Sequence, residues 1–249
     1  MQPSSDRLAE RLVAAHARHE PVAWKDLPVL GFEDAYRVQR SVIDALAPVG
    51  GWKIGLKADT GFSAHAALPS FLIVPSGTNL RGPAWRLRGI EAEVAVRLGR
   101  DLTPADASAE AATLQTAIDA MLPVIEVVET RLADWETAPA PLKLADLQSF
   151  GALVIGAPRP PIPDFDPREV AARVSFDGRI VVETTGGNPA GHIATLLRLL
   201  AQQTAGCARR PQAGDIVTTG SCTGMSFAAA GSRVQASLMG LGEVDVRFD

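Results

Sequence analysis

The sequence has few cysteines and histidines, and this scarcity excludes whole classes of site. Two cysteines in 249 residues, Cys207 and Cys222, form no paired motif, which argues against a disulfide framework and predicts free thiols in a cytoplasmic protein. The four histidines show no His-x-His or His-x-x-x-His spacing, so a zinc site built from nitrogen and sulfur ligands is not expected. Any metal here would be a hard cation that prefers oxygen ligands.

Long apolar runs and runs of one charge are also missing. No hydrophobic stretch is long enough to cross a bilayer, and the opening MQPSSDRLAE lacks the apolar core of a signal peptide, so no membrane partner is expected. A net charge of −4 without a Lys/Arg stripe gives no reason to expect a nucleic acid. With 47% hydrophobic residues, the chain can form one globular domain with a sizeable core.

Hydrophobic spacing and turn residues predict an α+β protein with a β-rich core rather than a doubly wound sheet. Helices are expected at 5–20 and 32–47, from Thr103 to Pro123, and from Asn188 onward. Strands are expected at 50–59, 89–98, 124–129, in both arms of a hairpin around Asp177-Gly178, and at 214–221, 232–240 and 241–249.

Three glutamates stand out against these strands. In GIEAEVAVRL (89–98) the apolar residues alternate at period two, so Glu91 and Glu93 point to the same face, where like charges raise each other's pKa. Glu126 lies in the apolar run VIEVVE, where an ionised side chain is costly to bury without a cation. Three such carboxylates would suit Mg²⁺ or Mn²⁺.

The same residues also allow an ordinary interpretation. Glu91 could be a solvated strand end, Glu93 could pair with an arginine, and Glu126 could cap a turn. Glu-x-Glu is a common pattern, and spacing alone does not decide between the two interpretations.

Six segments, taken in order, resemble the fumarylacetoacetate hydrolase superfamily, and most closely its 2-keto-4-pentenoate hydratase and 4-oxalocrotonate decarboxylase branch. They are GWKIGLK, IEAEVAVRLGRDL, LPVIEVVETRLADW, LADLQSFG, GGNPAGHIATLL and AGDIVTTGS. With FEDAYRVQ at 32–39, the resemblance spans residues 32–249. It implies a mixed β-sandwich roll, with an N-terminal helical region at 1–49 and a catalytic domain at 50–249.

The resemblance also implies a metal centre and an active-site lysine. Glu91, Glu93 and Glu126 match three metal-binding carboxylates, which would hold Mg²⁺ or Mn²⁺ beside a 2-oxo acid. Lys53, in GWKIG, matches a lysine that holds the substrate's carboxylate or polarises its oxo group. An ordinary strand lysine with its charge in water is the alternative.

Three further residues match less specific parts of the pattern. Ser221, in TTGS, lies where the family brings a tight loop over the substrate, although its hydroxyl could equally satisfy local backbone. Asp146 is retained in ADLQSFG, which matches the family's ADNASSG loop, and we expect a catalytic role for it and for Ser221. Arg131, in TRLADW, would support the glutamates or pair with an acid.

Two segments depart from the branch's pattern. An acid usually follows the lysine, in a DEP..G stretch, but Ala67 and Leu68 precede Pro69 here. Leu147 and Phe150 replace polar residues of the ADNASSG loop. These changes leave the glutamates intact but remove groups that could move protons. They also predict an apolar substrate tail against Leu147, Phe150 and segment 64–77.

The implied activity is that of a hydro-lyase which adds water to a 2-hydroxy-2,4-dienoate in aromatic catabolism, giving a 4-hydroxy-2-oxo acid. A 4-oxalocrotonate-type 2-oxo acid decarboxylase would need the same metal and the same enolate. The third alternative is a non-catalytic relative that binds a partner enzyme. The resemblance also implies a homo-oligomer and allows association with a pathway decarboxylase.

Overall fold

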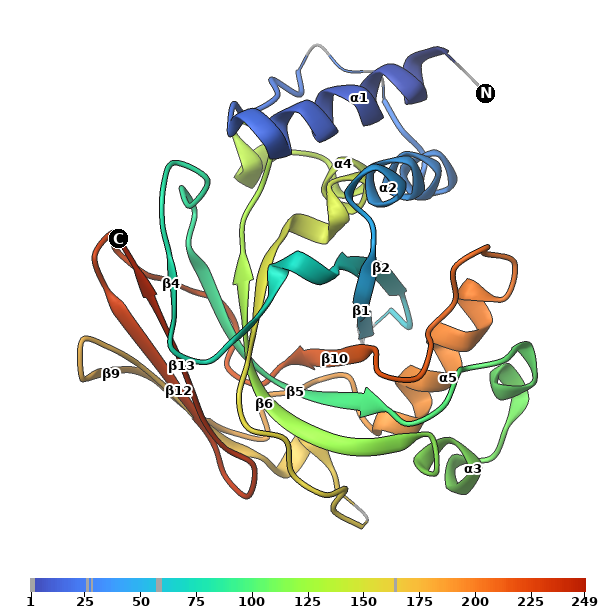
Figure 1. The fold of residues 1–249 in the computed structure, drawn as a ribbon, viewed down its shortest axis with the longest axis vertical. Coiled ribbons are helices and arrows are strands. Elements are labelled where there is room, and N and C mark those ends of the chain that lie inside the picture. Colours follow the sequence, from blue (N-terminus) through green and yellow to red (C-terminus); the bar gives the residue numbers. More distant parts are fainter. Residues whose placement is uncertain (1–2, 26, 28, 57–59, 164) are drawn as a thin grey trace.

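Two β-sheets form the body of the protein in the computed structural model, which describes residues 3–25, 27, 29–56, 60–163 and 165–249 (Figure 1). The larger sheet has the strand order β2-β1-β10-β5-β6-β7-β3, and β11 also pairs with β5. Its strands are β1 (Val49–Leu56), β2 (Ser63–Pro69), β3 (Ile73–Pro75), β5 (Gly89–Leu98), β6 (Ile118–Val128), β7 (Phe150–Ile155), β10 (Ile216–Ser221) and β11 (Ser226–Phe227).

The smaller sheet has the order β4-β13-β12-β8-β9. Its strands are β4 (Thr78–Leu80), β8 (Ala171–Phe176), β9 (Arg179–Thr185), β12 (Arg233–Leu238) and β13 (Gly242–Phe248). Each sheet mixes parallel and antiparallel pairs: β1 runs parallel to β10, and β13 parallel to β4. This mixed, β-rich architecture confirms the predicted α+β class. Residues 57–59, the end of the strand expected at 50–59, lie outside the described residues.

The helices are α1 (Pro3–Arg18), α2 (Phe32–Leu46), α3 (Ala111–Gln115), α4 (Ala140–Ala145) and α5 (Ile193–Thr204). The two N-terminal helices are confirmed, and α2 packs on α1, α4 and β2 (Figure 1). Their apolar faces, with Leu12 and Val42 fully buried, join the main core. The boundary between residues 49 and 50 stays a prediction. No helix in the described residues is long and apolar enough to span a membrane.

The face of β5 opposite the glutamates is wholly apolar. Ile90, Ala92, Val94 and Val96 are each 0% exposed and belong to one hydrophobic cluster with the inner residues of β12 and β13. Burial of such side chains contributes about 25 cal/mol per Å² of apolar surface. The packed face holds β5 in place, so its other face can carry charged groups.

The helix predicted from Thr103 to Pro123 is wrong. Thr103 does begin a short 3₁₀ turn and α3 follows, but residues from Ile118 onward form β6. A strand buried on both faces is a continuous apolar run that periodicity cannot distinguish from a helix. Pro123 lies just beyond the part of β6 that pairs with β7, and its carbonyl oxygen accepts a hydrogen bond from the Gly156 N–H.

Candidate active site and metal centre

The strand register assembles the three glutamates. In the antiparallel β5–β6 pair Glu91 lies directly opposite Glu126, and alternation along β5 puts Glu93 on the same face as Glu91. One carboxylate oxygen from each of the three lies within 4.8 Å of the other two. Glu93 and Glu126 are only 3% and 1% exposed. Glu126 therefore lies within β6 and does not cap a turn, and among the described residues Glu93 forms no ion pair with an arginine.

Burial and mutual repulsion make this cluster electrostatically unfavourable when it is empty. Burial, followed by the charges of Glu126 and Glu91, raises the pKa of Glu93 well above its ordinary value. Burial and the charge of Glu126 also raise the pKa of Glu91, while a hydrogen bond from Ser221 opposes that change. A bound cation would remove both the repulsion and the cost of burial.

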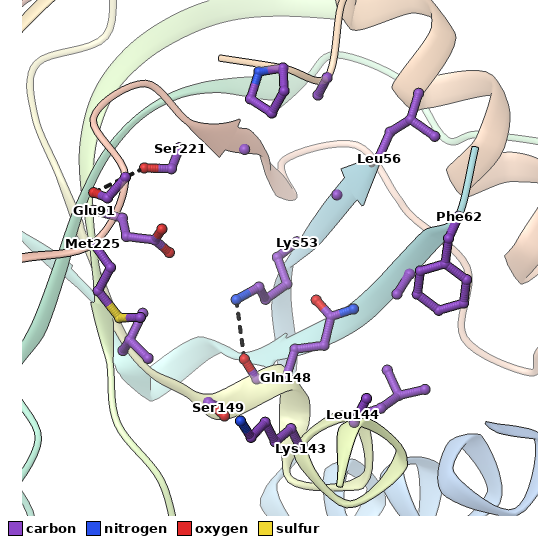
Figure 2. A pocket seen from close by; sticks show the side chains of 18 of the residues that line it. Lys53, Leu56, Phe62, Glu91, Lys143, Leu144, Gln148, Ser149, Ser221 and Met225 are labelled. Carbon is purple, nitrogen blue, oxygen red and sulfur yellow. Dashed lines mark hydrogen bonds between the residues drawn. The ribbon is translucent and has the colours of Figure 1, made fainter. Parts of the chain in front are cut away.

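Lys53 reaches this cluster from β1. Its ammonium group forms an ion pair with Glu126 and lies 3.4 Å from the Gln148 carbonyl oxygen, which accepts a hydrogen bond from it (Figure 2). Burial alone would lower the pKa of Lys53, but the charges of Glu126, Glu91 and Glu93 raise it above its ordinary value. Lys53 is therefore a protonated group held beside the carboxylates, and not a strand lysine with its charge in water.

The residues present fit a divalent cation. Three carboxylates and one ammonium group carry an excess of two negative charges, in a buried site whose donors are all oxygen atoms. Mg²⁺ and Mn²⁺ prefer such donors and leave further coordination positions to water or substrate.

A turn in the last residues of β10 (219–221), where its register with β5 shifts, closes one side of the site. Gly220, at φ +96°, donates its backbone N–H to Glu93 Oε2 over 3.2 Å. The buried Asn188 side chain holds this turn by donating to the carbonyl oxygens of Thr219 and Gly220. Asn188 thus packs against the turn and does not begin a helix, since α5 starts at Ile193. The turn directs Ser221 to the pocket edge beside Glu91 (Figure 2).

A second turn, residues 147–149, lies on the other side of Lys53. Leu147, Gln148 and Ser149 all have left-handed backbone angles, with φ between 50° and 59°. Such a conformation costs about 1–2 kcal/mol per non-glycine residue, so surrounding structure must impose it. Trp135 donates its indole N–H to Ser149 Oγ over 2.7 Å and fixes one end of the turn.

A buried ion pair fixes the other end of this turn. Asp146, 0% exposed, accepts a 2.6 Å hydrogen bond from Arg131 Nε, and Arg131 also donates to the carbonyl oxygens of Asp146 and Phe150. Burial raises the pKa of Asp146, against the opposing charge of Arg131. Asp146 does not line the pocket, so its geometry indicates a positioning role for the turn rather than contact with substrate.

The pocket has a volume of about 580 Å³ and opens from the glutamate cluster. Lys53, Glu91, Gln148 and Ser221 form its polar end. Its other walls include Leu56, Phe62, Lys143 and Leu144 (Figure 2). Phe32 and Trp135 line the same pocket. This volume is ample for a small organic acid.

The prediction that Leu147 and Phe150 form the pocket wall is wrong. Both are 0% exposed and point into the core, and of segment 64–77 only Ala64 lines the pocket. Sequence reasoning missed Gln148, Lys143 and Trp135, which do line it. The left-handed turn reverses which residues of the loop face the core, and nothing in ADLQSFG signals that reversal.

Gly187 is required where the loop before α5 crosses the β10 turn. A Cβ atom at Gly187 would overlap the carbonyl oxygen of Cys222, which is backbone and cannot move aside. We expect Gly187→Ala to lower the free energy of unfolding by about 1–3 kcal/mol, as measured by urea denaturation. Gly206→Ala is the matched control, because a Cβ there meets nothing within 4 Å and should change stability little. Equal stability of the two variants would contradict this packing account.

Comparison with known proteins gives a consistent set of relatives. Residues 62–249 match the family described as Fumarylacetoacetate (FAA) hydrolase C-terminal. The 2-keto-4-pentenoate hydratase 2 of Dechloromonas aromatica (strain RCB) is 32% identical over 256 residues, which cover 96% of this chain and 95% of that protein. The 4-oxalocrotonate decarboxylase of Pseudomonas putida is 25% identical over 94% of this chain and 91% of its own length.

The solved structures agree on the fold. The 4-oxalocrotonate decarboxylase from Pseudomonas putida G7, complexed with magnesium and adipate, has a TM-score of 0.85 with this chain. Its sequence is 24% identical, and the superposition covers 98% of this chain and 96% of that one. The two chains therefore share both the sheets and the N-terminal helices.

Proposed function

The chain belongs to the fumarylacetoacetate hydrolase family, and on this premise we propose that it is a metal-dependent hydro-lyase that adds water to a 2-hydroxy-2,4-dienoate. The observation that carries the proposal is the cluster of three carboxylates and one buried ammonium group at the end of an apolar-walled pocket. A relative that aligns with 96% of this chain, a 2-keto-4-pentenoate hydratase, supports it.

Glu91, Glu93 and Glu126 would hold Mg²⁺ or Mn²⁺, as the notable excess of negative charge in the cluster favours. When bound, the cation supplies Lewis-acid polarisation of the substrate's oxygen atoms. The structure of the Pseudomonas decarboxylase contains magnesium, which supports this choice of cofactor.

Lys53 would place fixed positive charge where negative charge develops as the dienol becomes a ketone. Its ion pair with Glu126 and its bond to the Gln148 carbonyl restrict the direction of the ammonium group. Protonation of the far carbon gives an unsaturated ketone, and water then adds in conjugate fashion to give the 4-hydroxy-2-oxo acid. Lys53, whose ammonium group carries a proton, is the candidate within this chain for the group that holds or moves that proton.

The test is the loss of dienol absorbance in chelated protein before and after Mg²⁺ or Mn²⁺ is added. A hydratase consumes a 2-hydroxydienoate only with the cation and releases no CO₂. A decarboxylase of the same fold releases CO₂ from 4-oxalocrotonate, the substrate named for the second relative. A non-catalytic relative gives no reaction with any divalent ion, and that result would overturn the proposal.

Lys53→Met should separate chemistry from metal binding. We expect kcat to fall about a hundredfold or more, because the fixed charge beside the reacting oxygen is lost. The rise in melting temperature on adding Mg²⁺ should remain, because all three carboxylates remain. Lys25→Met, at a side chain that is 69% exposed, should change neither quantity. Full activity of Lys53→Met would exclude the role proposed for this lysine.

A further inference from the structure

We infer that Lys143 binds a second carboxylate at the distal end of the substrate, so that the preferred substrate is a dicarboxylic 2-hydroxydienoate. This inference rests on the proposed function and specifies its substrate class. Lys143 lies on α4 and lines the pocket, together with Trp135 and Leu144. It stands beside Ser149, with the 148–149 turn between it and Lys53 (Figure 2).

The charge of Lys143 has no carboxylate partner in the part of the chain that the structure describes. Among those residues no acidic oxygen lies within 4.0 Å of its Nζ atom, which donates a hydrogen bond to the Glu136 carbonyl oxygen over 3.4 Å. By contrast, Lys53, the other lysine among the described residues that line the pocket, is already paired with Glu126. Lys143 therefore offers a positive charge to a ligand, whereas Lys53 shares its charge with the metal cluster.

Lys143 is also held in a defined place. Its Nζ atom lies 4.5 Å from the centroid of the Trp135 ring, a cation–π geometry. The ring cannot swing freely because its indole N–H is bonded to Ser149 Oγ. A lysine fixed in this way loses less side-chain entropy on binding an anion than a free surface lysine does.

Apolar side chains also line the pocket, in addition to its polar end at Lys53 and Glu91 and to Lys143. Leu56, Phe62 and Leu144 present carbon atoms to the cavity, which suits a hydrocarbon segment between two charged ends. The 2-oxygen and first carboxylate would lie at the glutamates and Lys53, and the distal carboxylate at Lys143. A monocarboxylic dienoate would leave the Lys143 charge without a partner.

The same geometry favours hydration over decarboxylation of such a diacid. Loss of the distal carboxylate as CO₂ breaks its C–C bond and transfers the bonding electron pair to the carbon chain. A cation that stabilises the carboxylate in the bound substrate opposes that transfer, because the negative charge moves away from it. Lys143 therefore suits a substrate whose distal carboxylate is retained in the product.

Two pairs of 2-oxo acids, each differing only in the terminal group, test this inference. They are 2-oxohexanoate with 2-oxoadipate, and 2-oxopentanoate with 2-oxoglutarate, titrated calorimetrically into Mg²⁺-loaded protein. We expect the diacid of at least one pair to bind about tenfold more tightly, the effect of one charge-assisted hydrogen bond. Lys143→Met should remove this preference while leaving the affinity for the monoacid unchanged, and Lys143→Arg should keep it.

Arg179→Met is the matched control, because Arg179 is an exposed cation on β9 outside the pocket, and the preference should survive there. Equal binding of monoacids and diacids by the wild type would overturn the inference and leave the proposed function intact, as would a preference that persists in Lys143→Met. Failure of all four acids to bind in the presence of Mg²⁺ would overturn both.

Discussion

Glu93→Gln should abolish metal-dependent activity and, at the same time, raise the melting temperature of the metal-free protein. Loss of a metal-binding carboxylate should lower kcat/KM at least a hundredfold, since even groups that only orient metal ligands contribute 10- to 100-fold. The stabilisation by Mg²⁺ seen in thermal unfolding should disappear as well. Activity falls while the stability of the metal-free protein rises, because the buried Glu93 carboxylate that binds the cation destabilises the protein when no cation is bound.

The sign follows from the electrostatics of the empty site. Burial and two neighbouring carboxylates raise the pKa of Glu93 well above its ordinary 4.5 in the folded state. The folded state then holds this proton more tightly than the unfolded state, so the metal-free protein loses stability as pH rises from 4.5 through the raised pKa. Glutamine carries no charge at any pH in this range. If Glu93→Gln increases the free energy of unfolding of the metal-free protein by about 1 kcal/mol at neutral pH, its melting temperature should rise by about 2–4 °C.

Glu129→Gln provides the matched control for this experiment. Glu129 follows β6, the strand next to β5, and is also 3% exposed, but its carboxylate accepts backbone N–H groups from Arg86 and Leu87. Its replacement should therefore destabilise the protein, by about 1–3 kcal/mol. If Glu93→Gln destabilised the metal-free protein as Glu129→Gln does, the cluster would be a structural network and not a preformed cation site.

Asp146→Asn should cause the largest loss of stability among these substitutions. It leaves the Arg131 guanidinium buried without a counter-charge, which typically costs about 3–5 kcal/mol. The melting temperature should fall by about 6–20 °C, measured by circular dichroism. Because Asp146 also fixes the left-handed 147–149 turn, kcat should fall in the folded variant at low temperature while Mg²⁺ binding persists.

Glu183→Gln is the appropriate comparison for Asp146→Asn. Glu183 pairs with Arg173 in an ion pair whose side chains are 59% and 51% exposed, and such pairs contribute about 0–1 kcal/mol. If Asp146→Asn lost no more stability than Glu183→Gln, the buried Arg131–Asp146 pair would not be what holds the 147–149 turn. Normal kcat in the folded Asp146→Asn variant would assign Asp146 to stability alone.

Local periodicity was enough to predict several helices and strands of this protein. The helices at α1 and α2, the hairpin at Asp177-Gly178 and the strands β5, β10, β12 and β13 each carry their own pattern of apolar residues and turn residues. The period of two along β5 was enough to place Glu91 and Glu93 on one face, whatever the rest of the chain does. The order of the motifs then identified the family, which the comparisons show.

Which side chains meet in the site depends on contacts between distant parts of the chain. The partner of Lys53 is Glu126, three strands away in the sheet order, and no local pattern encodes that pairing. Residues 118–128 form a strand that is covered by other elements on both faces, so both faces carry mainly apolar side chains. The sequence there lacks the alternation of apolar and polar residues from which a strand is predicted. Gln148 faces the pocket and Leu147 the core because the Arg131–Asp146 pair holds a left-handed turn. Side-chain direction there depends on backbone angles that distant contacts impose, and local propensity disfavours those angles.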